Sequence, residues 1–227
     1  MRVLIVLVVL CLVMAVSVQA APSYLGPTGN ILTPDTLTAP AKGFDIGYHF
    51  LSDTFGSDVD RSIVHGNIGL TPAIEVGLSW VDDNHGGSGD SDLSVNGKWR
   101  FLEETATGPA LAVGVLDLTS DAFDNNDPSF YFVVSKNLTA VAEDVANGQS
   151  KPLRGTLGIG GGFYDGIFAA LDWTLAPQLS VMAEYTQAGD NLFSGGVRWA
   201  ATPEIRLDAA LIDFTDFGAG ISYTKGF

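Results

Sequence analysis

Cysteine is nearly absent from this chain of 227 residues, because Cys11 is the single one. It falls within an apolar stretch at the start, so the rest of the chain has no thiol. This excludes disulfides and cysteine-ligated metal sites as a means of stabilising the domain. Charged residues are also scarce, at 16%, whereas hydrophobic residues make up 46%. Because disordered chains are rich in charge and poor in apolar residues, we expect a folded domain.

Basic residues are few: 11 lysines and arginines stand against 26 acidic residues, which gives a formal net charge of −15. Binding to nucleic acid needs a basic surface that neutralises phosphates. The composition therefore excludes nucleic acid as a partner. It is easier to reconcile with cations, or with a neutral or cationic glycan.

Residues 1–20 have the three parts of a secretory signal peptide. Arg2 gives the basic start, residues 3–16 form the apolar body, and Val18-Gln19-Ala20 matches a small-residue cleavage site. The alternative is a retained membrane helix, but the apolar run is short for crossing a bilayer. We expect the peptide to be cleaved after Ala20 and the remaining chain to be exported.

Long helical periodicity is also missing. Outside residues 138–154, where 139–148 is expected to form a short helix, apolar residues recur at every second position. Phe44, Ile46 and Tyr48, for example, alternate with polar or small residues, as in a strand with one apolar face. Twelve such segments follow one another: 44–50, 61–70, 73–81, 93–101, 110–118, 129–137, 155–163, 167–174, 179–186, 192–200, 205–213 and 217–227.

Connections of two kinds alternate between these segments. The short ones often contain proline and lie at 71–72, 175–178 and 201–204; the acidic ones lie at 52–60, 82–91, 119–128, 188–191 and 213–216. Short turns on one rim and longer polar loops on the other are typical of outer-membrane barrels. An even number of strands of this length also suits a tilted bilayer crossing. The sequence therefore predicts an all-β fold, an antiparallel up-and-down transmembrane β-barrel of about 12 strands (10–12).

The faces of the predicted strands distinguish a membrane barrel from a soluble one. The face taken as outer is apolar and carries aromatic residues near the rims: Trp80, Trp99, Trp173, Tyr185, Trp199 and Tyr223. Such aromatic girdles lie at membrane–water interfaces. A secreted soluble β-protein is the alternative, but a soluble barrel would turn its apolar face inward.

Ionisable residues of both signs occupy the opposite face, which we expect to line the lumen. They are Asp45, Glu75, Lys98, Arg100, Asp172, Glu184, Arg198, Arg206 and Asp208. Adjacent strands bring Glu75 near Lys98 and Arg100. In the same way they bring Glu184 near Arg198 and Arg206. Since a charge in a narrow lumen is costly unless it is paired or hydrated, we expect internal ion-pair ladders. The functional alternative is a charged constriction that selects ions.

The last segment ends in an aromatic pattern, with Tyr223 and a terminal Phe227. A terminal phenylalanine on an alternating strand resembles the signal by which bacterial outer-membrane barrels are recognised for assembly. Lys225 departs from that pattern, in which an apolar or aromatic residue stands third from the end. We expect residues 44–50 to pair with this strand and close the sheet. The expected partners are outer membrane lipids and the barrel-assembly machinery.

Residues that carry catalysis or bind cofactors form no recognisable motif. His49, His65 and His85 are far apart in the sequence and lack the spacing of metal ligands. No catalytic, cofactor or metal site is therefore expected, and the protein is expected not to be an enzyme. A lumenal hydrolase that uses His49 stays open as a minor alternative.

Two acidic loops have a composition that favours loose binding of divalent cations. One covers residues 86–92, and the other contains Asp121, Asp124 and Asp127. Hard cations such as Ca²⁺ and Mg²⁺ take carboxylate and carbonyl oxygens as ligands. Solvated loops are the simpler interpretation, so no cofactor is expected beyond such loosely bound ions.

Residues 25–37 are rich in turn-forming residues and precede the first strand. Their motif residues are Gly26, Thr28, Gly29, Ile31 and Pro34. This order resembles the Gly-x-Thr-Gly-Leu-Ile-x-x-Pro motif that opens the YjbH-like family of outer-membrane β-barrel proteins, with Asn30 in place of the apolar residue. The resemblance implies a link with exopolysaccharide production or export. It implies no catalytic residues.

The expected organisation is a signal peptide at residues 1–20, an N-terminal periplasmic segment at 21–42 and the barrel at 43–227. The N-terminal segment should lie at or inside the short-turn rim, and whether it plugs the lumen stays open. The expected function is that of a non-enzymatic envelope accessory in the bacterial outer membrane, connected with exopolysaccharide and with polysaccharide or export components as partners. The alternative is a small porin-like channel for ions or small solutes.

Overall fold

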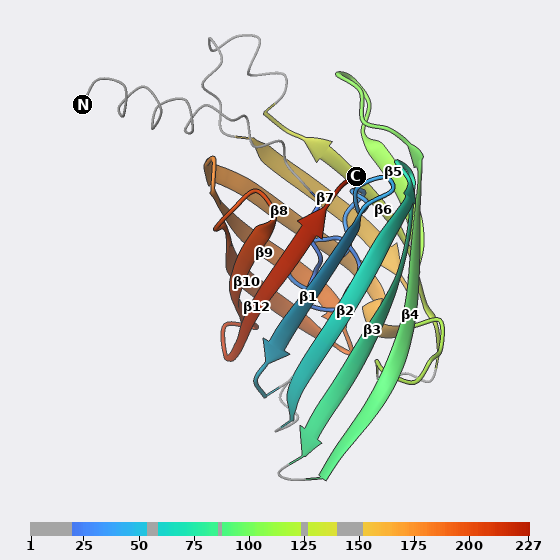
Figure 1. Ribbon diagram of the computed structural model, residues 1–227, viewed down its shortest axis with the longest axis vertical. Helices are drawn as coiled ribbons and strands as arrows, with labels where there is room; N and C mark the ends of the chain where they lie inside the picture. The colour runs from blue at the N-terminus through green and yellow to red at the C-terminus, as the bar shows by residue number, and fades with distance from the viewer. Residues whose placement is uncertain (1–19, 54–58, 86–87, 124–126, 140–151) are drawn as a thin grey trace, which may run out of the picture.

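The computed structural model describes residues 20–53, 59–85, 88–123, 127–139 and 152–227. Within them, twelve strands form one closed barrel in which every strand is antiparallel to both neighbours (Figure 1). The strands are β1 (Phe44–Leu51), β2 (Asp60–Thr71), β3 (Ile74–His85), β4 (Ser88–Leu102), β5 (Ala110–Leu116), β6 (Ser129–Asn137), β7 (Leu153–Gly160), β8 (Gly166–Ala176), β9 (Leu179–Ala188), β10 (Asp190–Ala200), β11 (Ile205–Ile212) and β12 (Asp216–Lys225). The predicted antiparallel barrel of about 12 strands is confirmed.

Helical structure is confined to one short 3-10 turn, η2 (Gly162–Tyr164), in the part of the chain that the structure describes. No helix in that part is long and apolar enough to cross a membrane. The short helix expected at 139–148 lies almost wholly outside the described residues, as does the expected signal peptide at 1–20.

The barrel closes between its first and last strands. β1 and β12 pair in register along the whole of β1, with Phe44 opposite Lys225, as the sequence predicts. The ring of Phe44 lies 6.0 Å from that of Tyr223 and 5.9 Å from that of Phe227. Aromatic residues from the two ends of the barrel's chain thus pack together at one rim. Closure leaves no unpaired strand edge in the sheet.

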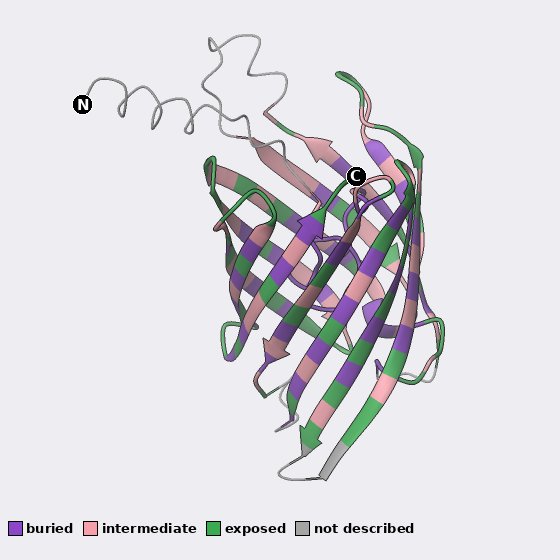
Figure 2. Ribbon diagram, viewed as in Figure 1, coloured by how far each residue is buried: buried purple, intermediate pink, exposed green. Residues whose placement is uncertain are grey.

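Burial alternates along the strands (Figure 2). Many large apolar residues of the strands are exposed on the outward face. Val64 and Leu78 are 56% and 53% exposed, and all four tryptophans are about half exposed. The inward face carries the polar and charged residues. This is the reverse of a soluble barrel. A closed barrel with an apolar exterior can span lipid, because its backbone groups are paired within the sheet.

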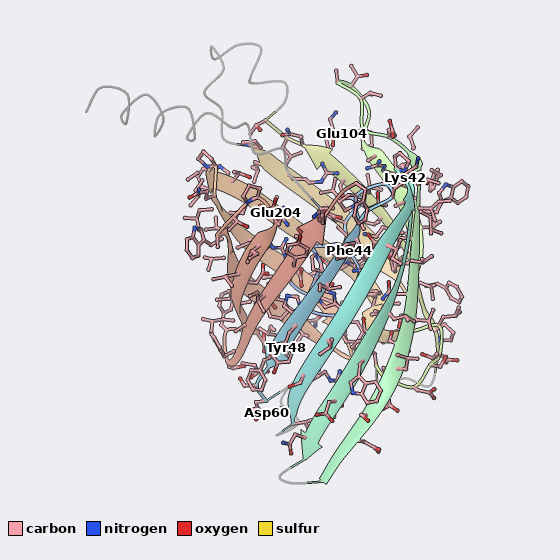
Figure 3. The ribbon with its side chains drawn as sticks, viewed as in Figure 1. Lys42, Phe44, Tyr48, Asp60, Glu104 and Glu204 are labelled. Atoms are coloured by element: carbon pink, nitrogen blue, oxygen red, sulfur yellow. The ribbon has the colours of Figure 1, made fainter. Side chains whose placement is uncertain are left out.

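The connections between successive strands lie alternately at two opposite rims. Lys42, Glu104 and Glu204 lie at one rim, here called the short-turn rim, and Asp60 lies at the opposite rim, here called the acidic rim (Figure 3). Two connections differ from expectation. In the predicted loop 188–191, Asp190 already pairs with Ala188, so only Gly189 lies between β9 and β10. The polar run 82–91 is not a loop, since β3 and β4 continue as a hairpin in which His85 stands opposite Ser88. Its polar residues indicate exposure to water and do not prevent backbone pairing.

The N-terminal segment folds into the barrel. Residues 21–39, called the plug segment below, are almost all buried and lie inside the ring of strands (Figure 1). Proline and glycine prevent a long strand there, so the segment folds back on itself, and the N–H of Tyr24 donates to the carbonyl of Ile31 at 2.8 Å. Gly26 has a φ of +114°, which glycine adopts readily. The segment therefore fills the lumen, a question that the sequence leaves open.

An aromatic cluster occupies the lumen near the acidic rim. Phe123 comes from the β5–β6 connection, and Phe163 and Tyr164 come from η2. The rings of Phe123 and Phe163 lie 5.9 Å apart, and those of Phe163 and Tyr164 lie 5.3 Å apart, both edge to face. Phe168 of β8 packs against Tyr164 at 5.1 Å, in space that Gly158 leaves free because it has no side chain. Apolar packing thus occupies part of the lumen opposite the short-turn rim.

Candidate functional site: the plugged lumen

Four buried charged residues of the barrel wall bind the plug segment, mainly through its main chain. They are Glu75 of β3, Lys98 of β4, Glu184 of β9 and Arg198 of β10, called the clasp residues below. Each points inward because its neighbours along the strand point outward. All four belong to the set of nine that the sequence predicts to line the lumen.

Glu184 accepts hydrogen bonds from three consecutive backbone N–H groups. Its carboxylate oxygens lie 3.1 Å from Ile31 N, 2.9 Å from Leu32 N and 3.1 Å from Thr33 N. The Thr33 hydroxyl donates a fourth bond at 2.7 Å. Successive N–H groups that converge in this way form an anion-binding concavity. The expected pairing of Glu184 with arginines of neighbouring strands is therefore wrong, since the plug's main chain compensates its charge.

Arg198 makes the converse contacts and donates to three backbone carbonyls. Nη2 lies 3.0 Å from the Pro22 oxygen and 3.1 Å from the Asn30 oxygen, and Nη1 lies 3.2 Å from the Gly29 oxygen. Nε donates to Asp208 of β11 at 2.5 Å. Because a guanidinium presents its donors as a rigid fork, one oriented side chain holds both ends of the plug's turn.

Glu75 and Lys98 stand opposite each other on β3 and β4 and bind neighbouring parts of the plug. Lys98 Nζ lies 3.8 Å from Glu75 Oε1, as predicted from the strand order. Lys98 donates to the carbonyls of Thr28 and Leu37 at 2.6 and 2.7 Å. Glu75 accepts from the N–H groups of Thr28 and Ala39 at 3.0 and 2.6 Å, and from the Thr28 hydroxyl.

The clasp is electrically balanced, with two acidic and two basic residues. A buried charge is costly unless it is paired or hydrogen-bonded, and here the main chain of the plug supplies most of the partners. Without the plug, four charges on the inner wall would need water to replace those partners. The clasp is thus a set of buried wall charges that the plug segment covers.

Three other predicted lumen residues make different contacts. Arg100 does not pair with Glu75: it lies two residues beyond Lys98 along β4, donates to a carbonyl of the β2–β3 turn at 2.6 Å and lies 3.5 Å from Glu103. Asp172 is half-buried, and one of its carboxylate oxygens has no hydrogen-bond partner. Arg206 is buried and donates to a hydroxyl of β12 at 3.1 Å.

A row of four buried titratable residues crosses the inner wall beside the plug. Nε2 of His49 lies 3.7 Å from Oδ2 of Asp208. Nδ1 of His49 lies 3.1 Å from Nε2 of His65, within hydrogen-bond distance. Nδ1 of His65 lies 3.7 Å from Oδ1 of Asp45. The two remaining members of the predicted lumen set, Asp45 and Asp208, therefore flank a pair of histidines.

Both ends of this row connect to side chains that hold the plug. At one end, Asp208 orients Arg198 through the bond to Nε. At the other end, Asp45 accepts a hydrogen bond of 2.8 Å from Nδ2 of Asn67. The same amide nitrogen donates to the carbonyl of Gly26 in the plug at 2.7 Å. The row is therefore linked to the plug through a guanidinium and through an amide.

Two glycines and one tyrosine shape the surroundings of the histidines. A Cβ built on Gly220 would collide with the ring of His49, and one on Gly47 would lie 2.5 Å from Nε2 of His65. Tyr24 of the plug packs against His49 with ring centroids 4.5 Å apart. Burial raises the pKa of the Tyr24 hydroxyl well above its usual range, so the plug meets the histidine pair with a neutral group.

The described residues show no metal centre, because no three or more histidine, cysteine, aspartate or glutamate side chains among them are placed to hold an ion. Asp124 and residues 86–87 fall outside the described part of the chain. Loose Ca²⁺ or Mg²⁺ at the acidic loops therefore stays a prediction. His49, the residue of the hydrolase alternative, has its ring nitrogens facing His65 and Asp208.

Sequence reasoning missed the plug's main chain as the partner of the clasp, and it missed the histidine pair. Backbone N–H and carbonyl groups are nearly the same along the chain, so a pattern of side chains does not predict which of them a wall residue binds. The histidine pair did leave a signal. His49 and His65 both fall on the inward face of consecutive predicted strands, and the two strands are antiparallel neighbours.

No protein-family model matches the chain, and no curated protein matches it. Among solved structures, the KdgM porin aligns with a TM-score of 0.52 at 11% identity, over 80% of this chain and 99% of the porin. The NanC porin aligns with a TM-score of 0.49 at 10% identity, over 81% and 100%. Omp33, an outer membrane protein of Acinetobacter baumannii, gives 0.48 at 10%, over 81% and 98%. At this identity the likeness to the KdgM porin concerns the fold: the chain is similar to an outer-membrane barrel in the arrangement of its strands.

Proposed function

We propose that this protein is a non-enzymatic outer-membrane β-barrel, closed by its own N-terminal segment, that acts as an envelope accessory in exopolysaccharide production or export. The plug is the observation that carries the proposal. The motif residues that resemble the YjbH-like family all lie in it: Gly26, Thr28, Gly29, Ile31 and Pro34. Thr28, Gly29 and Ile31 contact the clasp directly. A motif in this place has a physical role, since it shapes the backbone that the clasp binds.

Three features support a location in the outer membrane of a bacterial cell. The exterior of the closed barrel is apolar, with exposed tryptophans of the kind that form interfacial girdles. The expected signal peptide would export the chain. The terminal Phe227 packs at the barrel seam, where an assembly signal on the last strand would lie. Fractionation of cell envelopes tests the location: a soluble periplasmic protein would contradict it.

The accessory role is tested by measuring the exopolysaccharide released by a strain that lacks the gene. We expect less polymer than in the parent strain, and restoration by the full chain. A chain that lacks residues 22–38 should assemble but restore little, because the plug is removed while the expected cleavage site is kept. Unchanged polymer in the strain without the gene would overturn the accessory role.

A second candidate function is a small channel for ions or solutes that conducts when the plug leaves. The clasp favours it, because without the plug the four charges would form a hydrated constriction. Planar bilayer recordings test it. The full chain should stay closed at neutral pH, and the variant lacking residues 22–38 should show stable conductance steps that Glu75→Gln alters. A folded variant without the plug that does not conduct would exclude the channel.

A further inference from the structure

The histidine pair has a limited capacity for protons. The side chains of His49 and His65 are 0% exposed, their rings are 15° from parallel, and Nδ1 of His49 lies 3.1 Å from Nε2 of His65. A hydrogen bond at this distance needs one N–H donor and one lone pair. At least one of the ring nitrogens in the pair must therefore stay unprotonated while the contact exists.

The outer nitrogens of the pair show where a first added proton can go. Each lies 3.7 Å from a carboxylate of Asp208 or Asp45, beyond hydrogen-bond length, and neither nitrogen has a hydrogen-bond partner. When both histidines are neutral, one of the two outer nitrogens carries no proton, and its lone pair of electrons points toward a carboxylate. One added proton gives both outer nitrogens an N–H to donate. A second added proton removes the lone pair on which the central bond depends.

The charged groups around the row do not compensate the positive charge that the second proton would add. The titratable and charged groups that face the row are Tyr24 from the plug, Asp45 from β1, Glu75 from β3, Lys98 from β4, Arg198 from β10, and Arg206 and Asp208 from β11. Three are acidic, three are basic, and the tyrosine is neutral. Two imidazolium ions with ring centroids 5.1 Å apart would repel each other in a site closed to water, and relief requires the rings to separate and become hydrated.

Separation of the rings would act on the plug at three points. The ring of Tyr24 packs against that of His49, with the ring centroids 4.5 Å apart. Asp208 shares its carboxylate between His49 and Arg198, which holds three plug carbonyls. Asp45 shares its carboxylate between His65 and the amide that binds Gly26. The pair is therefore placed so that its own geometry controls contacts at both ends of the plug's turn.

We propose that His49 and His65 form a proton-sensitive latch that holds the plug at neutral pH and releases it when both are protonated. The inference rests on the proposed role of the plug as the closure of the lumen. In the released state both imidazoles are hydrated and each can carry a proton, whereas the central bond of the plugged state leaves one ring nitrogen unprotonated. Because the released state can bind more protons than the plugged state, lowering the pH favours release.

A single cysteine in the plug measures release directly. Only Cys11, within the expected leader, is a natural cysteine, and Leu32 is fully buried. The full mature chain with Leu32→Cys is labelled with a maleimide in lipid vesicles at pH 7.5 and pH 5. Each rate is divided by that of the urea-unfolded protein at the same pH, which removes the pH dependence of the thiol. We expect normalised labelling to be at least about tenfold faster at pH 5.

Variants that cannot take the second proton separate the latch from a general effect of acid. His49→Asn and His65→Gln keep a polar group near the lost nitrogen, and each should abolish most of the acceleration. His85→Asn, in the β3–β4 hairpin, is the matched control and should retain it. Heat-modifiable migration on a gel confirms that each variant is folded. Equal acceleration in all variants, or none in the parent chain, would overturn the latch.

The latch and the proposed function fail in different ways. Polymer release by cells and conductance of the variant without residues 22–38 test the function and need no change of pH. If those fail while acid still exposes Leu32→Cys, the latch stands and the function is wrong. If they succeed while labelling is independent of pH, the plug is a closure that is not controlled by protons.

Discussion

At the scale of single residues, charge is handled in an unusual way: wall side chains are neutralised largely by backbone groups of the plug. Glu184 and Arg198 make three main-chain bonds each. A buried N–H or carbonyl left without a partner costs about 1–3 kcal/mol. Each clasp residue therefore holds the plug in place, and the plug in turn makes each buried charge tolerable.

Glu184→Gln should loosen the plug without unfolding the barrel. The amide keeps the size of the side chain but replaces one acceptor oxygen by a donor, so at least one plug N–H loses its partner at a cost of about 1–3 kcal/mol. Labelling of Leu32→Cys at pH 7.5 should accelerate by about 10- to 100-fold. Glu204→Gln, in the exposed turn between β10 and β11, is the control. Equal rates in the two variants would mean that Glu184 does not hold the plug.

Gly220→Ala should destabilise the barrel through a single methyl group. A Cβ at this position would collide with the ring of His49, whereas the nearest atom to a Cβ on Gly97 is 3.8 Å away. Overpacking of this kind costs about 1–3 kcal/mol. Urea unfolding of the two variants in vesicles should show a lower midpoint for Gly220→Ala and little change for Gly97→Ala. A shift of the same size in both would show that the loss of stability comes from replacing a strand glycine in general and not from a collision with the ring of His49.

At the scale of elements, period-2 alternation located the strands well because each strand separates an apolar exterior from a polar interior. The same reasoning failed at 82–91, where the hairpin of β3 and β4 extends beyond the apolar band and both faces are polar. The pattern reports what each face touches. It therefore predicts the apolar part of a strand and not its full hydrogen-bonded length.

Deletion of Phe227 should impair assembly in cells more than stability in detergent. The residue is 83% exposed, and its ring lies 5.9 Å from that of Phe44 at the seam, so its removal takes little buried surface from the fold. If it serves as the assembly signal, the amount of barrel in the outer membrane should fall several-fold, while the free energy of unfolding of the refolded protein, measured in urea, changes by less than about 0.5 kcal/mol. Phe214→Ala, in the exposed β11–β12 connection, provides the comparison. Normal amounts in the membrane without Phe227 would remove it from that role.

At the scale of the whole molecule, the barrel is apolar outside and filled inside. Its exterior suits lipid, its lumen near the short-turn rim holds the plug, and aromatic rings pack near the acidic rim. A barrel of this size has an interior that side chains and a short segment can fill. The plug segment and the aromatic cluster thus occupy the lumen from its two ends.

Leu78→Lys tests the membrane-facing exterior as a whole. Leu78 lies on the outward face between Val76 and Trp80, within the apolar band. A lysine near the middle of a bilayer costs a barrel about 2–4 kcal/mol, whereas near an interface the cost is about 0–1 kcal/mol. Ser91→Lys, on the polar end of the β3–β4 hairpin, should therefore be nearly neutral in the same vesicle refolding assay. Equal stability of the two variants in vesicles would contradict a membrane-spanning exterior.

The sequence by itself determined the barrel, its closure by residues 44–50 against the last strand, and the inward face of the clasp and histidine residues. All of these follow from alternation, which depends only on neighbours along the chain and on the contrast between lipid and lumen. The pairing of Glu75 with Lys98 could be predicted too, because it needs only the order of adjacent strands.

Only the tertiary structure decided what fills the lumen and what each charge binds. The plug reaches Glu184 across about 150 residues of chain, and its backbone donors have no signature in the sequence. Likewise, the 3.1 Å contact of His49 with His65 depends on strand register and on the room that two glycines leave. Side-chain patterns predict which face a residue occupies, whereas the partner it meets there depends on the three-dimensional path of the whole chain.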